Sequence, residues 1–250
     1  MIKKTSIQCL DDIIERNDLT IPTDYVMMKK KFKKELFNIY LSSLKNGHIV
    51  LDLNSGIDGL YNELAQSPAE YLSLEQNPQI REFLTKNGIK AEDWNIPEIP
   101  LPDNSVNYVL SVPFIEHLPT YLDAVKLLIE IKRVLRPGGK LLMVVPNYLR
   151  LKEIFFEDYK HGWVTTKKRM NDMLLDCQYE ITDTRYTIGW ITMRRTLLII
   201  LGRFLISIGM TILRFGIVSR CMELIKLESF GYKLKKTLFE LIVIEAKTKG

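Results

Sequence analysis

The 250-residue sequence has little cysteine and no apolar leader. Its three cysteines, Cys9, Cys177 and Cys221, lie far apart, so they indicate neither a disulfide framework nor a metal site. The first residues, Met1 to Thr5, lack the apolar run that a secretory signal peptide needs. A reducing, cytoplasmic location is therefore the expectation.

The sequence also lacks a lysine- and arginine-rich tract with interleaved aromatic residues, an internal repeat and a low-complexity segment. Nucleic-acid binding is therefore not expected as its main role. The net charge of +5 is small, and it fits an anionic membrane surface or an acidic substrate without selecting either. Hydrophobic residues make up 46% of the chain, which is enough for the full core of one domain with additions.

The most informative stretch runs from Val50 to Gly59. An apolar run reaches Asp52, passes through a turn that contains Asn54 and Gly56, and continues into helix-forming residues. This order is typical of a buried parallel strand that leads to the N-terminus of a helix, where open α/β sheets bind ligands. By itself the pattern also fits a plain turn.

Further elements follow in a regular order. A second short strand is predicted over 70–75, ending at Glu75, and the segment 101–111 is typical of a turn that leads into a strand. A helix is predicted over 121–135 from its apolar periodicity. The Pro-Gly-Gly sequence within 136–140 then ends this helix and returns the chain to a strand over 141–145.

In this order and spacing, residues from about Val50 to Asn147 resemble the class I S-adenosylmethionine-dependent methyltransferases. The most specific part of the resemblance is "IKRVLRPGGKLLMVVPN", which follows "LPDNSVNYVLSVPFIEHLP". The resemblance implies an α/β fold with a Rossmann-like, seven-stranded, mostly parallel sheet, helices on both faces and an antiparallel last strand. The cofactor S-adenosylmethionine would lie across the carboxyl ends of strands one to four.

The resemblance also implies roles for particular residues. Asp52, Asn54 and Gly56 would line the methionine part of the cofactor, and Glu75 would bind the ribose hydroxyls. Asp93 and Trp94 would flank the adenine. Ser111 would sit at the tip of strand four, near the methyl donor.

The sequence departs from the family at two of these positions. Asn54 stands where the family usually has glycine, and Asn107 replaces the usual aspartate near strand four. Asn tolerates a left-handed backbone better than other non-glycine residues, but its side chain would enter the space near the cofactor. A protein that has kept the fold and lost the chemistry is therefore one alternative. A nicotinamide-dependent oxidoreductase is another, disfavoured because the first glycine of the dinucleotide fingerprint is missing.

The chain is expected to form one methyltransferase-like domain. A helical lead-in over 1–46 would contain an amphipathic helix from Tyr25 to Lys45, and the cofactor-binding core would cover 47–147. The substrate-side half would comprise 148–188 and 237–247. It is predicted to include a helix over 167–177, a strand over 179–187 and a last strand over 237–246.

His161 is the candidate catalytic residue. An imidazole with a pKa near 6.5 could accept the proton of a hydroxyl group as its oxygen attacks the methyl group. Alignment of donor and acceptor could also supply most of the rate without a base. In that case His161 would be a packing residue. His117 is interpreted as a structural cap. The predicted reaction is methylation, at oxygen, of a small or lipid-linked acceptor.

The segment 189–227 is too long and apolar for a hairpin loop. Between 196 and 213 its only charged residue is Arg203, and Arg195, Arg214 and Arg220 would share one side of a continuous helix with it. A helical insertion that lies in a membrane interface is the favoured interpretation, which would place the protein peripherally on the inner face of the membrane. A buried lid, a homodimer contact and a true membrane span are the alternatives.

Overall fold

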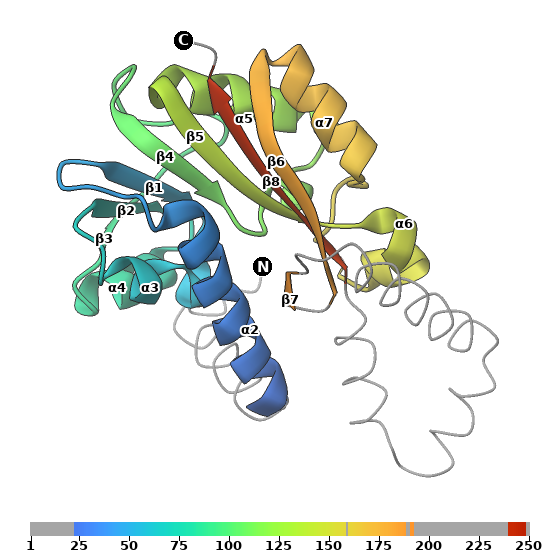
Figure 1. Cartoon of the computed structure of the whole chain (residues 1–250), viewed down its shortest axis with the longest axis horizontal. Helices are drawn as coiled ribbons and strands as arrows, with labels where there is room; N and C mark the ends of the chain where they lie inside the picture. Colours follow the sequence, from blue (N-terminus) through green and yellow to red (C-terminus); the bar gives the residue numbers. More distant parts are fainter. Residues whose placement is uncertain (1–22, 159, 189–190, 193–239, 249–250) are drawn as a thin grey trace, which may run out of the picture.

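The protein is described by a computed structural model that covers residues 23–158, 160–188, 191–192 and 240–248. Its centre is a twisted sheet with the strand order β3-β2-β1-β4-β5-β8-β6-β7 (Figure 1). The strands are β1 (Ile49–Leu53), β2 (Glu70–Leu74), β3 (Lys90–Glu92), β4 (Val106–Ser111), β5 (Leu135–Pro146), β6 (Tyr179–Ile188), β7 (Ile191–Thr192) and β8 (Leu241–Thr248).

Strands β1 to β5 pair in parallel, whereas β8 runs antiparallel to both of its neighbours, β5 and β6. The predicted mostly parallel sheet with an antiparallel last strand is thereby confirmed. The two-residue β7 forms a hairpin with β6, and the sequence did not predict it. Strand β7 lies within the segment 189–227, whose start was predicted to be helical.

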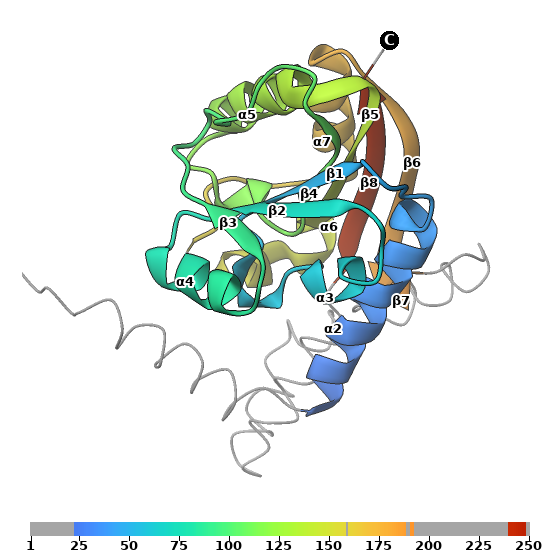
Figure 2. The same ribbon diagram turned by 90° about the vertical axis from the view of Figure 1, so that its left-hand side faces the viewer.

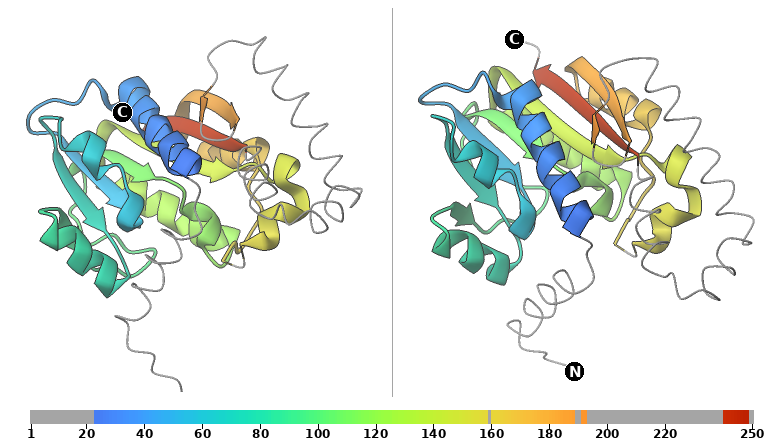
Figure 3. Two further views of the ribbon diagram at one scale, coloured as in Figure 1. Left: turned by 90° about the horizontal axis from the view of Figure 1, so that it is seen from below. Right: turned by 60° about the horizontal axis from the view of Figure 1, so that its bottom comes forward.

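Helices cover both faces of the sheet, as predicted (Figures 2 and 3). Four of them begin at side-chain caps: Asn77, Thr120, Asn147 and Thr166 each accept a hydrogen bond from a backbone N–H in the first turn. The helical elements are α2 (Thr23–Leu36), η1 (Phe37–Leu41), η2 (Gly56–Asp58), α3 (Tyr61–Leu64), α4 (Pro78–Lys86), η3 (Ile115–His117), α5 (Tyr121–Val134), α6 (Tyr148–Leu151), η4 (Lys152–Glu157) and α7 (Lys167–Asp176).

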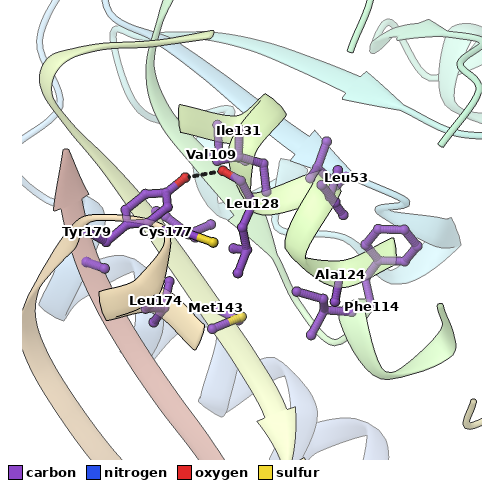
Figure 4. Packing of buried hydrophobic residues seen from close by; sticks show 14 of the residues in the cluster. Leu53, Val109, Phe114, Ala124, Leu128, Ile131, Met143, Leu174, Cys177 and Tyr179 are labelled. Atoms are coloured by element: carbon purple, nitrogen blue, oxygen red, sulfur yellow. Dashed lines mark hydrogen bonds between the residues drawn. The ribbon is translucent and has the colours of Figure 1, made fainter. Parts of the chain in front are cut away.

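The core has one layer on each face of the sheet. On one face, α5 and α7 pack against alternate residues of the central strands, and the Tyr179 hydroxyl donates a hydrogen bond to the Leu128 carbonyl at 2.8 Å (Figure 4). On the other face, Phe32 and Leu36 of α2 pack with residues of η1 and α3 against Val50 and other residues of the sheet. Because side chains alternate along a strand, both faces of the same strands are buried.

The predicted helices agree with the structure to within a few residues, with one exception. The helix predicted over 25–45 ends at Leu41, and its last five residues form a π-helical turn. Except for β7, the apolar segment 189–227 lies outside the described residues, and so do Arg195, Arg203, Arg214 and Arg220. Within the described residues, no helix is both long enough and apolar enough to cross a bilayer.

Candidate functional site

The turn after β1 has the backbone that the sequence predicts for close approach to a ligand. Asn54 and Gly56 both have positive φ, of 50° and 63°, and the Asn54 N–H donates to the Leu74 carbonyl at 2.7 Å. A Cβ added at Gly56 would meet no other atom within 4 Å. The inner side of this turn is therefore open, at the carboxyl ends of β1 and β2.

Glu75 meets this turn directly. Its carboxylate is buried, and Oε2 accepts a hydrogen bond from the Gly56 N–H at 3.1 Å while Oε1 accepts one from the Asn77 N–H at 3.0 Å. The carboxylate is thus held in one position between two loops. A carboxylate has about four lone-pair sites, so two remain for other donors.

Asp52 is buried on the opposite face of β1 from Leu51 and Leu53. Its Oδ2 accepts a hydrogen bond from the Tyr71 hydroxyl at 2.7 Å, whereas Oδ1 has no partner among the described residues. Burial raises the pKa of this carboxyl to about 7, and the Tyr71 hydrogen bond opposes the shift. Asp52 is therefore ready to ionise when a cation approaches.

Trp94 and Asn54 are joined across the edge of the sheet. The Trp94 indole N–H donates to Asn54 Oδ1 at 3.0 Å, and the buried ring packs against Phe114 with centroids 5.9 Å apart. The Asn54 side chain, which the sequence predicts to enter the cofactor space, thus points to Trp94. The structure brings together these two predicted residues, which are 40 positions apart.

Asp93 lies further out. Its side chain is 68% exposed and forms an ion pair with Arg81 at 2.9 Å. Beside it is an open pocket of about 460 Å³, lined on its other side by Glu130 and Arg133 of α5. These two residues are already paired with each other at 2.8 Å, and the pocket shares only Asp93 and Trp94 with the predicted cofactor residues. We therefore assign this pocket no role in cofactor binding.

The acceptor side is formed after β4. Ser111 is buried at the end of the strand, and its Oγ has no partner among the described residues. The loop that contains His161 packs on the following turn: the Gly162 N–H donates to the Glu116 carbonyl at 2.9 Å, and the Trp163 indole to the Ile115 carbonyl at 3.0 Å. A Cβ at Gly162 would lie 2.0 Å from the Leu118 carbonyl oxygen, so only glycine permits this approach.

This packing brings three titratable side chains together. The His117 and His161 rings have centroids 5.0 Å apart, and the buried Glu116 carboxyl lies next to them. His161 Nδ1 is 2.6 Å from the Phe155 carbonyl oxygen, to which it donates, so the lone pair of that ring is on Nε2. Burial raises the pKa of Glu116 to about 8. Burial also lowers the pKa of His117, and the neighbouring His161 lowers it further.

Two residues of this cluster were missed or misread from the sequence. No role was predicted for Glu116 from the sequence, although an acid next to a histidine shortly after a predicted strand is a recognisable signal. The interpretation of His117 as a cap is wrong, because Thr120 caps α5 and η3 has no side-chain cap. The His117 ring instead faces His161.

Residues 51–143 match the sequence profile of a family described as "Methyltransferase domain". The chain is 34% identical over 144 residues to an uncharacterised protein of Methanocaldococcus jannaschii, over 55% of this chain and 61% of that protein. It is 47% identical over 53 residues to a protein of Mycolicibacterium smegmatis named "Probable S-adenosylmethionine-dependent methyltransferase", over 21% of this chain and 20% of that one. The chain thus covers less than two thirds of the length of either relative.

Solved structures share the fold at low sequence identity. An S-adenosylmethionine-dependent methyltransferase from Archaeoglobus fulgidus has a TM-score of 0.57 and 16% identity, over 90% of this chain and 99% of that one. Phosphoethanolamine N-methyltransferase 2 of Haemonchus contortus, in complex with S-adenosyl-L-methionine, has a TM-score of 0.57 and 15% identity, over 87% of this chain and 52% of that one. The [4+2]-cyclase SpnF has a TM-score of 0.57 and 12% identity, over 86% of this chain and 80% of that one. The fold alone therefore does not identify the reaction.

Proposed function

We propose that this chain, whose residues 51–143 match the family described as "Methyltransferase domain", is a class I S-adenosylmethionine-dependent methyltransferase that transfers the methyl group to an oxygen of a small acceptor. The choice of S-adenosylmethionine as cofactor follows from the family. The class of acceptor and the oxygen as attacked atom are proposed in addition.

The proposed function rests on the polar groups at the carboxyl ends of β1, β2 and β4. Asp52 Oδ1 and Ser111 Oγ are buried there without partners among the described residues. A buried polar atom without a hydrogen bond costs about 1–3 kcal/mol, so a ligand that supplies the missing partner would be stabilised by it. Two such atoms beside an open glycine turn fit a polar ligand.

The cofactor would be bound by groups whose chemistry matches its parts. Asp52 would bind the ammonium group of the methionine part, and the Gly56 turn would let the backbone approach. Glu75 would accept hydrogen bonds from the two ribose hydroxyls through its remaining lone pairs. Trp94 would provide an apolar wall for the adenine, with Asn54 holding its indole, and Asp93 would lie at the outer end of the base.

On the acceptor side, His161 would position the acceptor hydroxyl through its free Nε2 lone pair. In the reaction the acceptor oxygen forms a bond to the methyl carbon, the bond from that carbon to sulfur breaks, and S-adenosylhomocysteine is released. The hydroxyl proton passes to Nε2 and then to solvent. The sulfonium is already a strong electrophile, so the protein contributes mainly alignment and this proton transfer.

Glu75→Ala tests the cofactor site. Charge-assisted hydrogen bonds are worth about 1.5–3 kcal/mol each, so the variant should bind S-adenosylhomocysteine at least about ten-fold more weakly in calorimetry. Glu70→Ala, at the exposed start of the same strand, is the matched control and should bind like the wild type. Circular dichroism checks that both variants are folded.

Absence of binding by the wild type at millimolar S-adenosylhomocysteine would support the alternative that the fold has lost its chemistry through Asn54. Binding of NAD in place of S-adenosylhomocysteine would support the oxidoreductase. A membrane surface contact through 189–227 stays a prediction, because most of that segment lies outside the described residues. The single-domain organisation, a lipid-linked acceptor and a homodimer also stay predictions.

A further inference from the structure

Glu116, His117 and His161 each present one ligand atom to the same small volume, and these atoms lie within 4.8 Å of one another. They come from two segments: the turn η3 after β4, and the loop before α7. Their side chains are the three of the acceptor-side cluster described above. Two imidazoles and one carboxylate are a ligand set that divalent transition metals use in proteins.

The two histidines offer different ring nitrogens to this volume. His161 donates from Nδ1 to the Phe155 carbonyl, which leaves Nε2 free to coordinate. His117 offers Nδ1, which is buried and has no hydrogen-bond partner among the described residues. Metal-binding histidines characteristically donate their other N–H to a carbonyl or carboxylate, which fixes the ring and its tautomer.

Burial supplies an independent sign of a missing ligand. Glu116 is only 1% exposed, and its Oε2 has no partner among the described residues. An unpaired carboxyl oxygen and an unpaired ring nitrogen in one buried cluster are costly, because neither reaches water. A cation would satisfy both at once.

We propose that Glu116, His117 and His161 bind one divalent transition-metal cation, of which Zn²⁺ is the probe, with at least one coordination position open to the acceptor oxygen. Zinc takes nitrogen and carboxylate oxygen ligands at about 2.0–2.2 Å, so in a tetrahedral site the ligand atoms would approach to about 3.4 Å. Side-chain rotation can supply this closure, because the backbone of both segments is already joined by the Gly162 and Trp163 hydrogen bonds.

The cation changes the role of His161 in the proposed function. With the metal bound, the Nε2 lone pair is used in coordination, and an acceptor hydroxyl would bind the cation in place of the imidazole. A metal-bound hydroxyl is more acidic than a free one, so it gives up its proton to solvent more readily. Only this acceptor role rests on the proposed function; binding of the cation does not.

The test is calorimetry of the full chain, stripped with a chelator, against zinc chloride, with cobalt chloride as a spectroscopic substitute. We expect one cation per chain and visible cobalt bands from a site with two nitrogen ligands. Glu116→Gln and His161→Asn should each weaken zinc binding by more than about 100-fold, since outer partners of metal ligands alone account for 10–100-fold. His48→Asn, a histidine outside the cluster, is the control and should bind like the wild type.

Three results would overturn the inference: no zinc binding by the folded wild type, binding that both variants retain, or loss of binding on Asp158→Asn alone. Asp158 is at the rim, with Oδ2 3.9 Å from His161 Nε2 and a half-exposed side chain, so it represents a surface site. Glu116→Gln should still bind S-adenosylhomocysteine. Zinc binding without S-adenosylhomocysteine binding would reject the proposed function and leave the metal site standing, and the converse result would reject only the metal site.

Discussion

At the β1–β2 end of the candidate site the protein itself holds most of the polar side chains, whereas at the η3 end it leaves several of them unpaired. Glu75 is fixed by two backbone N–H groups, and Asn54 by Trp94. Glu116 Oε2 and His117 Nδ1 have no partner among the described residues. The first end keeps one unpaired atom, Asp52 Oδ1, beside side chains that are already held in place, whereas both unpaired atoms of the second end belong to the proposed cation site.

The two ends also differ in how they are positioned. The β1–β2 end depends on local backbone geometry, namely the positive φ of Asn54 and Gly56 next to a parallel strand pair. The η3 end depends on a contact between segments more than 40 residues apart, the Trp163 hydrogen bond to Ile115. Substitutions at the two ends should therefore have separable effects.

The largest expected effect is on the rate. His161→Ala should lower methyl transfer by about 10²–10⁴-fold, because it removes the Nε2 atom that is proposed to meet the acceptor. Affinity for S-adenosylhomocysteine should stay unchanged, since the residue is at the other end of the site. Single-turnover assays with an identified acceptor measure the rate of methyl transfer, and calorimetry measures the affinity for S-adenosylhomocysteine. A rate loss under three-fold would return His161 to a packing role.

A smaller effect is expected from Gly162→Ala. The added Cβ would collide with the Leu118 carbonyl, and forced overpacking typically costs about 1–3 kcal/mol. Unfolding in urea should show this loss, together with weaker zinc binding as His161 moves away from His117. Gly88→Ala is the comparison: its φ is +77° but its Cβ would meet open space, so it should lose about 1 kcal/mol and leave the cluster intact. Equal zinc binding by both variants would contradict the proposed role of the contact.

The smallest effect concerns pH at the other end. Asp52 has a pKa of about 7 when no ligand is present, so it is mostly protonated at pH 6 and mostly ionised at pH 7.5. Because the ligand's ammonium group pairs with the ionised form, affinity for S-adenosylhomocysteine should rise about five- to ten-fold over this range. The same raised pKa means that the stability contributed by Asp52 is present below about pH 4 and is lost as pH rises toward 7.

Asp52→Asn is the control for this pH dependence, since an amide does not ionise. Calorimetry across the range should give a flat profile for the variant, with weaker binding at pH 7.5 than the wild type. A wild-type profile that is equally flat would show that Asp52 does not meet the ammonium group.

The order of strands along the chain, the Asn54 and Gly56 turn, and the helix starts at Thr120 and Thr166 could be predicted from the sequence, because each depends on neighbours a few residues away. Apolar runs define buried strands, caps satisfy the first turn of a helix, and positive φ favours Gly or Asn. The antiparallel last strand came from the family resemblance. The hairpin strand β7 was missed, because two residues are too few for a periodicity to be recognised.

Only the tertiary structure decided which distant side chains meet. Asn54 finds Trp94 because β1 and β3 end at the same edge of the sheet, although β2 lies between them. Glu116 and His117 meet His161 because Gly162 lets one loop lie directly on the Leu118 carbonyl. The sequence by itself determined the elements, since they depend on local conformational preference and periodic burial. The cluster depends on a backbone contact that no local pattern encodes, so it became visible only when the chain was packed.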